Sequence, residues 1–241
     1  MKVLIIPDIH LHHKMFDRAD EILKFGQADR AVQLGDLVDD WGQQFNLPLY
    51  TKTLKRATQF HKDHPDTLWC MGNHDLTYFY PNSGMRESGH SKFAEGEVSV
   101  WLREMERAGA KSQIMHIVDN VIFTHAGLTE DWMKRRFERV GYKNFLPPER
   151  GLLHIVNHAS LRELWQEDSP IWARPQIDNY KMWGDKFQVV GHTPTSTITE
   201  SNNVLSTDAF STRQDGSPIG VERFVIVDTE STDWRLAEEE K

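Results

Sequence analysis

Short apolar runs alternate with stretches of helical periodicity along the first part of the chain. Residues 3–6, 31–34 and 67–71 are candidate strands, and the continuous apolar run at 3–6 is typical of a strand buried on both faces. Between them, hydrophobic residues recur at helical spacing over 16–23 and 49–60. This β-α-β-α-β order predicts parallel strands joined by crossover helices that cover the sheet.

In the later part of the chain the candidate strands cluster instead of alternating with helices. Residues 114–118 and 121–124 flank Asp119-Asn120, a dipeptide suited to a tight hairpin turn. Residues 80–97 have no clear period and are predicted to form a loop near a functional site. We predict further helices at 98–105, 130–139 and 152–165, further strands at 187–190, 204–207, 224–227 and 234–236, and a solvated tail at 238–241.

These elements together predict an α/β fold in which two mixed β-sheets pack as a sandwich flanked by α-helices. The 241 residues are enough for one sizeable hydrophobic core. No repeat of fixed period, Gly/Ser linker or low-complexity tract divides the chain. Residues 1–241 are therefore expected to form a single domain.

Composition and charge restrict the partners and the compartment. A formal net charge of −8 disfavours bulk binding to nucleic acid or to an anionic membrane surface. No apolar run reaches the ~20 residues of a membrane span, and the first residues lack a secretory apolar region. The one cysteine, Cys70, excludes an internal disulfide and fits a reducing compartment, so a cytoplasmic location is expected.

Five candidate strands run directly into residue types that bind metal ions. Because ligands bind at the carboxyl ends of strands in open α/β sheets, these clusters are expected to converge on one crevice. A lone Asp-x-His or Gly-Asp is more typical of a turn or a cap, whereas Gly-Asn-His-Asp is more specific, and the ordered set of five is what indicates a site. The clusters are Asp8-Ile9-His10, Gly35-Asp36-Leu37-Val38-Asp39, Gly72-Asn73-His74-Asp75, Thr124-His125-Ala126-Gly127 and Gly191-His192-Thr193-Pro194.

The side chains in these clusters indicate borderline divalent metals. Carboxylate and amide oxygens combined with imidazole nitrogens suit manganese, iron, zinc, cobalt or nickel, whereas calcium prefers oxygens alone. Two such ions about 3.5–4 Å apart, with a bridging hydroxide, can drive in-line displacement at phosphorus. A shared carboxylate would offset the repulsion between the ions, and Asp36 is the natural bridge. We expect two divalent ions, with manganese as the first candidate.

The order of the five motifs resembles the calcineurin-like metallophosphoesterases. Within that superfamily, His125-Ala126-Gly127-Leu128, Trp172-Ala173-Arg174-Pro175 and Gly191-His192-Thr193-Pro194-Thr195 are most similar to one branch. That branch holds the protein serine/threonine phosphatases and the symmetrical dinucleoside-tetraphosphate hydrolases. The resemblance implies His74 as general acid, with Asp39 as its hydrogen-bonded partner. It also implies a first metal on Asp8, His10 and Asp36, and a second on Asp36, Asn73, His125 and His192.

The chain departs from the branch at one position. The phosphatase pattern Gly-Asp-x-x-Asp-Arg-Gly carries a phosphate-binding arginine where this sequence has Asp40. Asp40 could point away, the substrate could differ from a phosphoprotein, or another arginine could substitute. Arg174 is the best candidate for such a substitute, and its alternative role is a surface salt bridge.

Three hypotheses on function follow from this pattern. The first is a phosphomonoesterase similar to the phosphoprotein phosphatases, with a metal-bridging hydroxide as nucleophile. The second keeps the metal centre but acts on a nucleotide, a dinucleoside polyphosphate or a phosphodiester, and the missing arginine favours it. The third is a non-catalytic scaffold, which the complete motif set disfavours. The expected partner is a phosphorylated substrate: a phosphoprotein, a nucleotide or a small phosphoester.

Residues beside the motifs receive simpler interpretations. Trp41 and Trp172 neighbour the site motifs and could stack on a base or form a pocket wall. Asp208 ends a late strand in a stretch resembling the branch's Asp-Thr-Gly motif, and a supporting or structural role is expected. The histidines without a matching partner motif are expected to be ordinary core or surface residues: His61, His64, His90, His116, His154 and His158.

Overall fold

The computed structural model describes residues 1–142 and 148–238. In this part of the chain the strands form a six-stranded sheet, in the order β11-β10-β1-β2-β3-β4, and a five-stranded sheet, in the order β5-β6-β7-β9-β8. The strands are β1 (Lys2–Ile6), β2 (Arg30–Gln33), β3 (Leu68–Cys70), β4 (Ser112–Gln113), β5 (Met115–Val118), β6 (Val121–Thr124), β7 (Phe187–Val190), β8 (Thr199–Ser201), β9 (Val204–Ser206), β10 (Val225–Asp228) and β11 (Trp234–Leu236).

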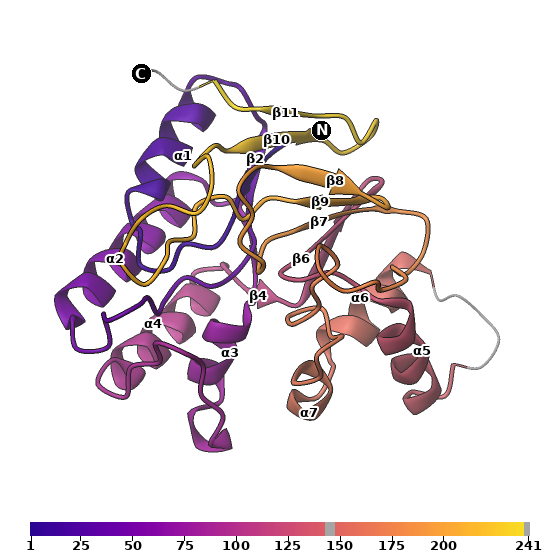
Figure 1. Cartoon of the computed structure of the whole chain (residues 1–241), viewed down its shortest axis with the longest axis horizontal. Helices are drawn as coiled ribbons and strands as arrows, with labels where there is room; N and C mark the ends of the chain where they lie inside the picture. The colour runs from indigo at the N-terminus through magenta and orange to yellow at the C-terminus, as the bar shows by residue number, and fades with distance from the viewer. Residues whose placement is uncertain (143–147, 239–241) are drawn as a thin grey trace.

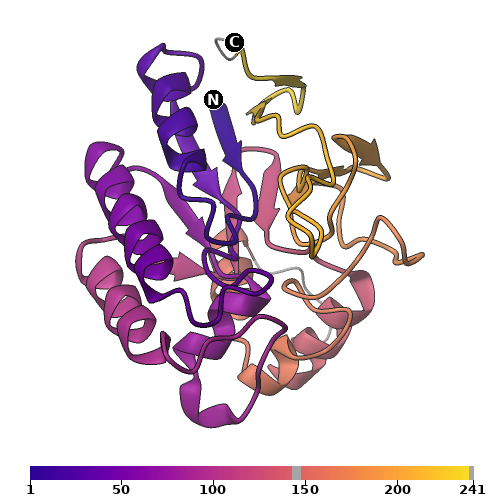
Figure 2. The same ribbon diagram turned by 60° about the vertical axis from the view of Figure 1, so that its left-hand side comes forward.

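Helices cover the outer sides of the two sheets. In Figure 1, α1 to α4 lie to the left of the sheets and α5 to α7 at the lower right, and Figure 2 shows α1, α2 and α4 side by side. None of the helices in the described residues is long and apolar enough to cross a membrane. The helices are α1 (Met15–Lys24), α2 (Leu47–Asp63), α3 (Asn73–Phe79), α4 (Glu95–Arg107), α5 (Glu130–Arg139), α6 (Glu149–Asn157) and α7 (Leu161–Leu164), with a short 3-10 helix, η1 (Pro81–Ser83).

Strand pairing confirms the predicted fold class of two mixed sheets with flanking helices. In the first sheet β1 pairs in parallel with β2 and β2 with β3, whereas β10 joins β1 antiparallel. In the second sheet β7 is parallel to both β6 and β9. At its edges, β5 pairs antiparallel with β6, and β8 pairs antiparallel with β9. The parallel strands bring the chain segments after β1, β2, β3, β6 and β7 to one edge of the sandwich.

The alternation of side chains along β1 shows how the layers are held together. Leu4 and Ile6 are fully buried in the core beneath α1 and α2, together with Phe16 and Phe60. Val3 and Ile5 point to the other face, into the core between the two sheets. Each such side chain contributes about 1.5–3 kcal/mol on burial, which stabilises the strand that leads into Asp8 and His10. A third core fills the space between the second sheet, α5 and α6, and includes Ile122, Trp132, Leu152 and Val156.

The sequence predictions were wrong at several element boundaries. The helix predicted at 152–165 is two helices, α6 and α7, because Ser160 caps a new helix start: its backbone N–H and its hydroxyl donate to Glu163 Oε2 at 2.8 and 2.6 Å. The strand predicted at 114–118 begins one residue later, as β5, and β4 just before it was not predicted; the chain passes at Ile114 from β4 in the first sheet to β5 in the second.

Other elements differ in kind from the prediction. Helix α3 begins directly at Asn73, where only a strand end was predicted, and β8 was not predicted at all. The predicted loop at 80–97 contains η1 and the first turn of α4. Most of the predicted tail, residues 239–241, lies outside the described residues.

His116 on β5 leads to a prediction about acid stability. Its side chain is buried and its Nε2 atom lies 2.8 Å from the Trp69 carbonyl. Burial lowers the pKa of His116 to about 4, below the ordinary value of 6.5. Between pH 6.5 and about pH 4, His116 is therefore protonated in the unfolded chain but neutral in the folded chain. The free energy of unfolding should fall by about 1.4 kcal/mol per pH unit over this range as the pH is lowered.

The measurement is urea unfolding of wild type and His116→Gln at pH 7 and pH 5. We expect the loss of unfolding free energy between the two pH values to be about 2 kcal/mol smaller in the variant. Equal losses in both proteins would show that His116 does not carry this acid sensitivity.

Candidate metal centre

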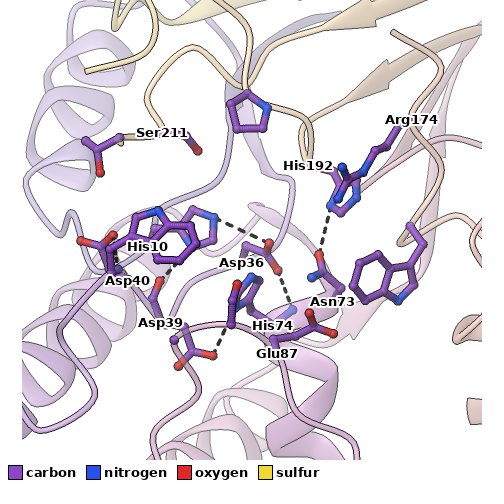
Figure 3. Close-up of a pocket in the computed structure, with 16 residues that line it drawn as sticks. His10, Asp36, Asp39, Asp40, Asn73, His74, Glu87, Arg174, His192 and Ser211 are labelled. Atoms are coloured by element: carbon purple, nitrogen blue, oxygen red, sulfur yellow. Dashed lines mark hydrogen bonds and ion pairs between the residues drawn. The ribbon is translucent and has the colours of Figure 1, made fainter. Parts of the chain in front are cut away.

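The residues predicted to form the site converge at the edge of the sandwich. Asp8 and His10 follow β1, Asp36 and Asp39 follow β2, and the other ligand candidates follow β3, β6 and β7. They surround a pocket of about 220 Å³, and Figure 3 shows side chains from the segments after β1, β2, β3 and β7 around it. The pocket lining includes His10, Asp36, Asp39, Asn73, His74, Arg174 and His192, while Asp8 and His125 are buried next to them.

Four donor atoms meet where the second ion was expected. His125 Nε2 lies 3.0 Å from Asn73 Oδ1, 3.1 Å from His192 Nδ1 and 3.3 Å from Asp36 Oδ2. His192 Nδ1 lies 3.0 Å from the same Asn73 oxygen. Atoms that share an ion at about 2.0–2.2 Å are spaced in this way along the edges of the coordination shell. These four side chains therefore fit a divalent cation.

The tautomer of His125 gives an independent test of this fit. Its Nδ1 atom lies 2.9 Å from the Leu34 carbonyl, which can only accept a hydrogen bond, so Nδ1 carries a proton. In the neutral ring Nε2 is then a lone pair that faces the oxygens of Asn73 and Asp36. Such a contact needs a proton or a metal ion between the atoms, and a carbonyl holding Nδ1 is the usual support of a metal-binding imidazole.

A looser group occupies the place expected for the first ion. His10 Nε2 lies 3.9 Å from Asp8 Oδ2 and 3.8 Å from Asp36 Oδ2. The Asp39 carbonyl accepts a hydrogen bond from His10 Nδ1 at 2.8 Å, so Nε2 is again the free lone pair. Ligating atoms of His10, Asp36 and His74 lie within 4.8 Å of one another, which places His74 beside this group.

The charge of the site favours cations. Burial lowers the pKa of His125, but the carboxylates of Asp36 and Asp8 raise it more, to about 10. Burial also raises the pKa of Asp8, and the neighbouring carboxylate of Asp208 raises it further. A proton or a metal ion is what this buried negative charge requires. Asp208 itself is buried and accepts a hydrogen bond from Ser211 Oγ at 2.8 Å.

Backbone strain is concentrated at the same place. Four non-glycine residues of the site have a left-handed backbone, with φ of 41° at His10, 53° at Asp36, 66° at Asp39 and 63° at His192. A left-handed backbone costs of order 1–3 kcal/mol at each such residue, and it persists where the surrounding structure enforces it. Asp75 helps to enforce the turn at Asp36, because its carboxylate accepts the backbone N–H of Asp36 at 2.7 Å and that of Leu37 at 3.0 Å.

Two glycines leave room for the carboxylates. A Cβ atom at Gly191 would lie 2.2 Å from Asp8 Oδ1, and one at Gly72 would lie 2.1 Å from Asp36 Oδ1. No side chain is compatible with such distances, so the glycines that precede His192 and Asn73 are required by the Asp8 and Asp36 carboxylates.

We expect Gly191→Ala to lose metal affinity and activity, because the added methyl group must displace the Asp8 carboxylate. The matched control is Gly96→Ala in α4, where an added Cβ meets nothing within 4 Å. Manganese titration followed by calorimetry should show at least about tenfold weaker binding for the first variant and wild-type binding for the second. Unchanged manganese binding by Gly191→Ala would contradict a ligand role for Asp8.

His74 and Asp39 form a pair at the edge of this metal centre. His74 Nδ1 lies 3.2 Å from Asp39 Oδ2, and the His74 backbone N–H donates to Asp36 Oδ1 at 2.9 Å. Burial lowers the pKa of His74, but the charges of Asp36 and Asp39 raise it more, to about 9. The pair therefore favours a protonated imidazole, which is the form that can donate a proton.

Three charged residues give the rest of the pocket its character. Among the described residues that line it, Arg174 is the one arginine or lysine. Asp40 also lines the pocket, and its carboxylate lies 3.6 Å from His12 Nε2. Glu87 comes from the predicted loop, and no role was predicted for it. Burial raises the pKa of Glu87 to about 7. No local pattern in residues 80–97 could have identified this carboxylate.

A comparison with protein families accounts for this arrangement. The model described as calcineurin-like phosphoesterase matches residues 1–210. With the clustered histidine and aspartate side chains, this match defines a metal-dependent phosphoesterase, a hydrolase. The chain belongs to the calcineurin-like phosphoesterase family, as its motifs predicted.

Solved structures with similar folds have low sequence identity to this chain. A hypothetical protein from Pyrococcus horikoshii OT3 is 11% identical with a TM-score of 0.48, and the match covers 99% of this chain and 88% of that one. A novel archaeal phosphodiesterase is 15% identical with a TM-score of 0.43, covering 98% of both chains. A metallophosphoesterase from Sphaerobacter thermophilus is 12% identical with a TM-score of 0.45, covering 100% and 89%. No curated protein matches the chain.

Proposed function

We propose that this site holds two divalent cations that share Asp36. The observation that carries the proposal is the position of Asp36 Oδ2, which lies 3.3 Å from His125 Nε2 and 3.8 Å from His10 Nε2. One carboxylate oxygen thus faces both groups of donors. The first cation would be held by Asp8, His10 and Asp36, and the second by Asp36, Asn73, His125 and His192.

Manganese is the cation we propose, with iron, zinc, cobalt or nickel as alternatives that the same donors accept. Bound there, the two cations would activate a water for in-line attack on phosphorus and neutralise the developing charge. His74 would protonate the leaving oxygen, because Asp39 holds its Nδ1 and leaves the other ring nitrogen free. Arg174 would bind a phosphate oxygen from the pocket wall.

The proposed reaction is hydrolysis of a phosphomonoester by an enzyme similar to the phosphoprotein phosphatases. Arg174 supports this assignment, since it lines the pocket beside His192 and can substitute for the arginine that Asp40 replaces. A general acid supports it as well, because a protein or small-molecule alkoxide is a poor leaving group without protonation.

A second candidate is hydrolysis of a nucleotide, a dinucleoside polyphosphate or a phosphodiester. The observation that favours it is the pair of carboxylates, Asp40 and Glu87, that line the pocket together with Arg174. Carboxylates that line the pocket repel a dianionic phosphomonoester more than a monoanionic phosphodiester. The exposed ring of Trp41 at the pocket could stack on a base.

The experiment is a comparison of para-nitrophenyl phosphate with bis-para-nitrophenyl phosphate, using purified protein reconstituted with manganese. A higher kcat/KM for the monoester supports the first candidate, and a higher value for the diester supports the second. A panel of phosphopeptides, mononucleotides and dinucleoside polyphosphates then identifies the substrate class. No hydrolysis of either aryl ester with manganese, iron, zinc, cobalt or nickel would overturn the proposed function.

A further inference from the structure

The Asp39 carboxylate has a set of hydrogen bonds that the proposed reaction does not explain. Its side chain is fully buried, and one of its oxygens, Oδ2, pairs with His74 Nδ1 at 3.2 Å. The other oxygen, Oδ1, accepts two phenol groups: Tyr50 from α2 at 2.8 Å, and Tyr78 from α3. Two elements that are separate in the sequence thus bring their hydroxyl groups to a single oxygen atom.

Both phenols can act only as donors toward Asp39. Burial, together with the Asp39 charge, raises the pKa of Tyr50 and of Tyr78 well above the ordinary value of 10, so both hydroxyl groups keep their protons. The Tyr78 hydroxyl also accepts the backbone N–H of Ser91 at 2.9 Å, which fixes the direction in which its proton points. Tyr50 and Tyr78 are themselves fully buried, so water does not compete for these bonds.

We propose that Tyr50 and Tyr78 are positioning residues for the His74–Asp39 pair. By occupying Oδ1 from two directions, the phenols prevent rotation of the Asp39 carboxylate and present Oδ2 to His74. The imidazole ring is then held so that its second nitrogen faces the leaving oxygen. This inference rests on the proposed role of His74 as general acid.

Asp39 is connected to the site through its backbone as well as through its side chain. Its backbone is left-handed, with φ of 66°, and its carbonyl accepts the His10 Nδ1–H at 2.8 Å. A single residue therefore orients a proposed metal ligand through its backbone and the proposed acid through its side chain. The hydrogen bonds that Tyr50 and Tyr78 donate to Asp39 reach its side chain, so removing their hydroxyl groups should affect proton donation more than metal binding.

The test uses Tyr50→Phe, Tyr78→Phe and the double variant with two aryl phosphates, one with a good and one with a poor leaving group. We expect each single variant to lower kcat for the poor leaving group by about tenfold and the double variant by about a hundredfold. KM, manganese content and kcat for the good leaving group should stay close to wild type. The control is Thr58→Val, which removes a hydroxyl from the side of α2 that contacts Trp101, where Trp101 Nε1 donates to Thr58 Oγ1 at 2.6 Å.

A double-mutant cycle separates positioning from general destabilisation. If the phenols act through His74, Tyr78→Phe should have no further effect on the poor leaving group in a His74→Gln background. Three results would each overturn the inference. The first is additive losses of Tyr78→Phe and His74→Gln in the cycle. The others are equal losses for both leaving groups in the tyrosine variants, and wild-type rates in the double tyrosine variant. Equal losses for both leaving groups in His74→Gln alone would instead overturn the proposed role of His74 as general acid. This result is distinguishable from a failure of the positioning role of Tyr50 and Tyr78.

Discussion

Replacing Asp36 by asparagine is expected to abolish turnover with manganese. Asp36 Oδ1 accepts the His74 backbone N–H at 2.9 Å, and Oδ2 faces both imidazoles of the proposed metal sites. An amide cannot serve both places. If its oxygen faces the cations, its NH₂ group meets the His74 N–H, and if it turns over, the NH₂ group points at the cations.

The expected loss is at least about a thousandfold in kcat, because the metal centre supplies several kcal/mol of transition-state stabilisation. Manganese bound per chain, measured on the same sample, should fall as well. Asp131→Asn is the control, since the Asp131 side chain is 80% exposed and does not line the pocket. An Asp36→Asn variant that retains both ions and wild-type turnover would rule out the shared carboxylate.

Replacing His74 by glutamine is expected to slow the reaction without emptying the metal centre. The variant loses the imidazole that Asp39 and Asp36 keep protonated, while the proposed ligand Asn73 beside it is unchanged. General acid catalysis contributes about 10²–10⁴ in rate, so we expect at least a hundredfold loss for poor leaving groups and a much smaller one for good leaving groups.

A leaving-group series of aryl phosphates measures this effect directly. For His74→Gln, log kcat should depend more steeply on the pKa of the leaving phenol than it does for wild type. An unchanged slope would show that His74 does not protonate the leaving oxygen.

The convergence of the site could be predicted because its signals are local. Asp8, Asp36 and Asn73 each follow an apolar run, and parallel strands end at the same edge of a sheet. The same argument extends to His125 after β6 and His192 after β7, although these strands belong to the second sheet. Local spacing thus indicated which residues meet, and the family motifs indicated what they could hold.

The support around the site could not be predicted, because it depends on contacts between distant segments. Tyr50 lies at a buried position of an amphipathic helix, where an aromatic residue is typical of the core, and nothing in its neighbourhood indicates a bond to Asp39. Glu87 lies in a stretch without periodicity. The break between α6 and α7 could not be predicted from periodicity, because the helical pattern continues on both sides of Ser160, and the cap is evident only in the structure.

We propose that side chains from five strand ends hold two adjacent cations. The most direct test is anomalous diffraction from crystals of the protein reconstituted with manganese. We predict two anomalous peaks about 3.5–4 Å apart, with Asp36 between them, one beside Asp8 and His10 and the other beside Asn73, His125 and His192. A single peak, or peaks away from Asp36, would contradict this claim.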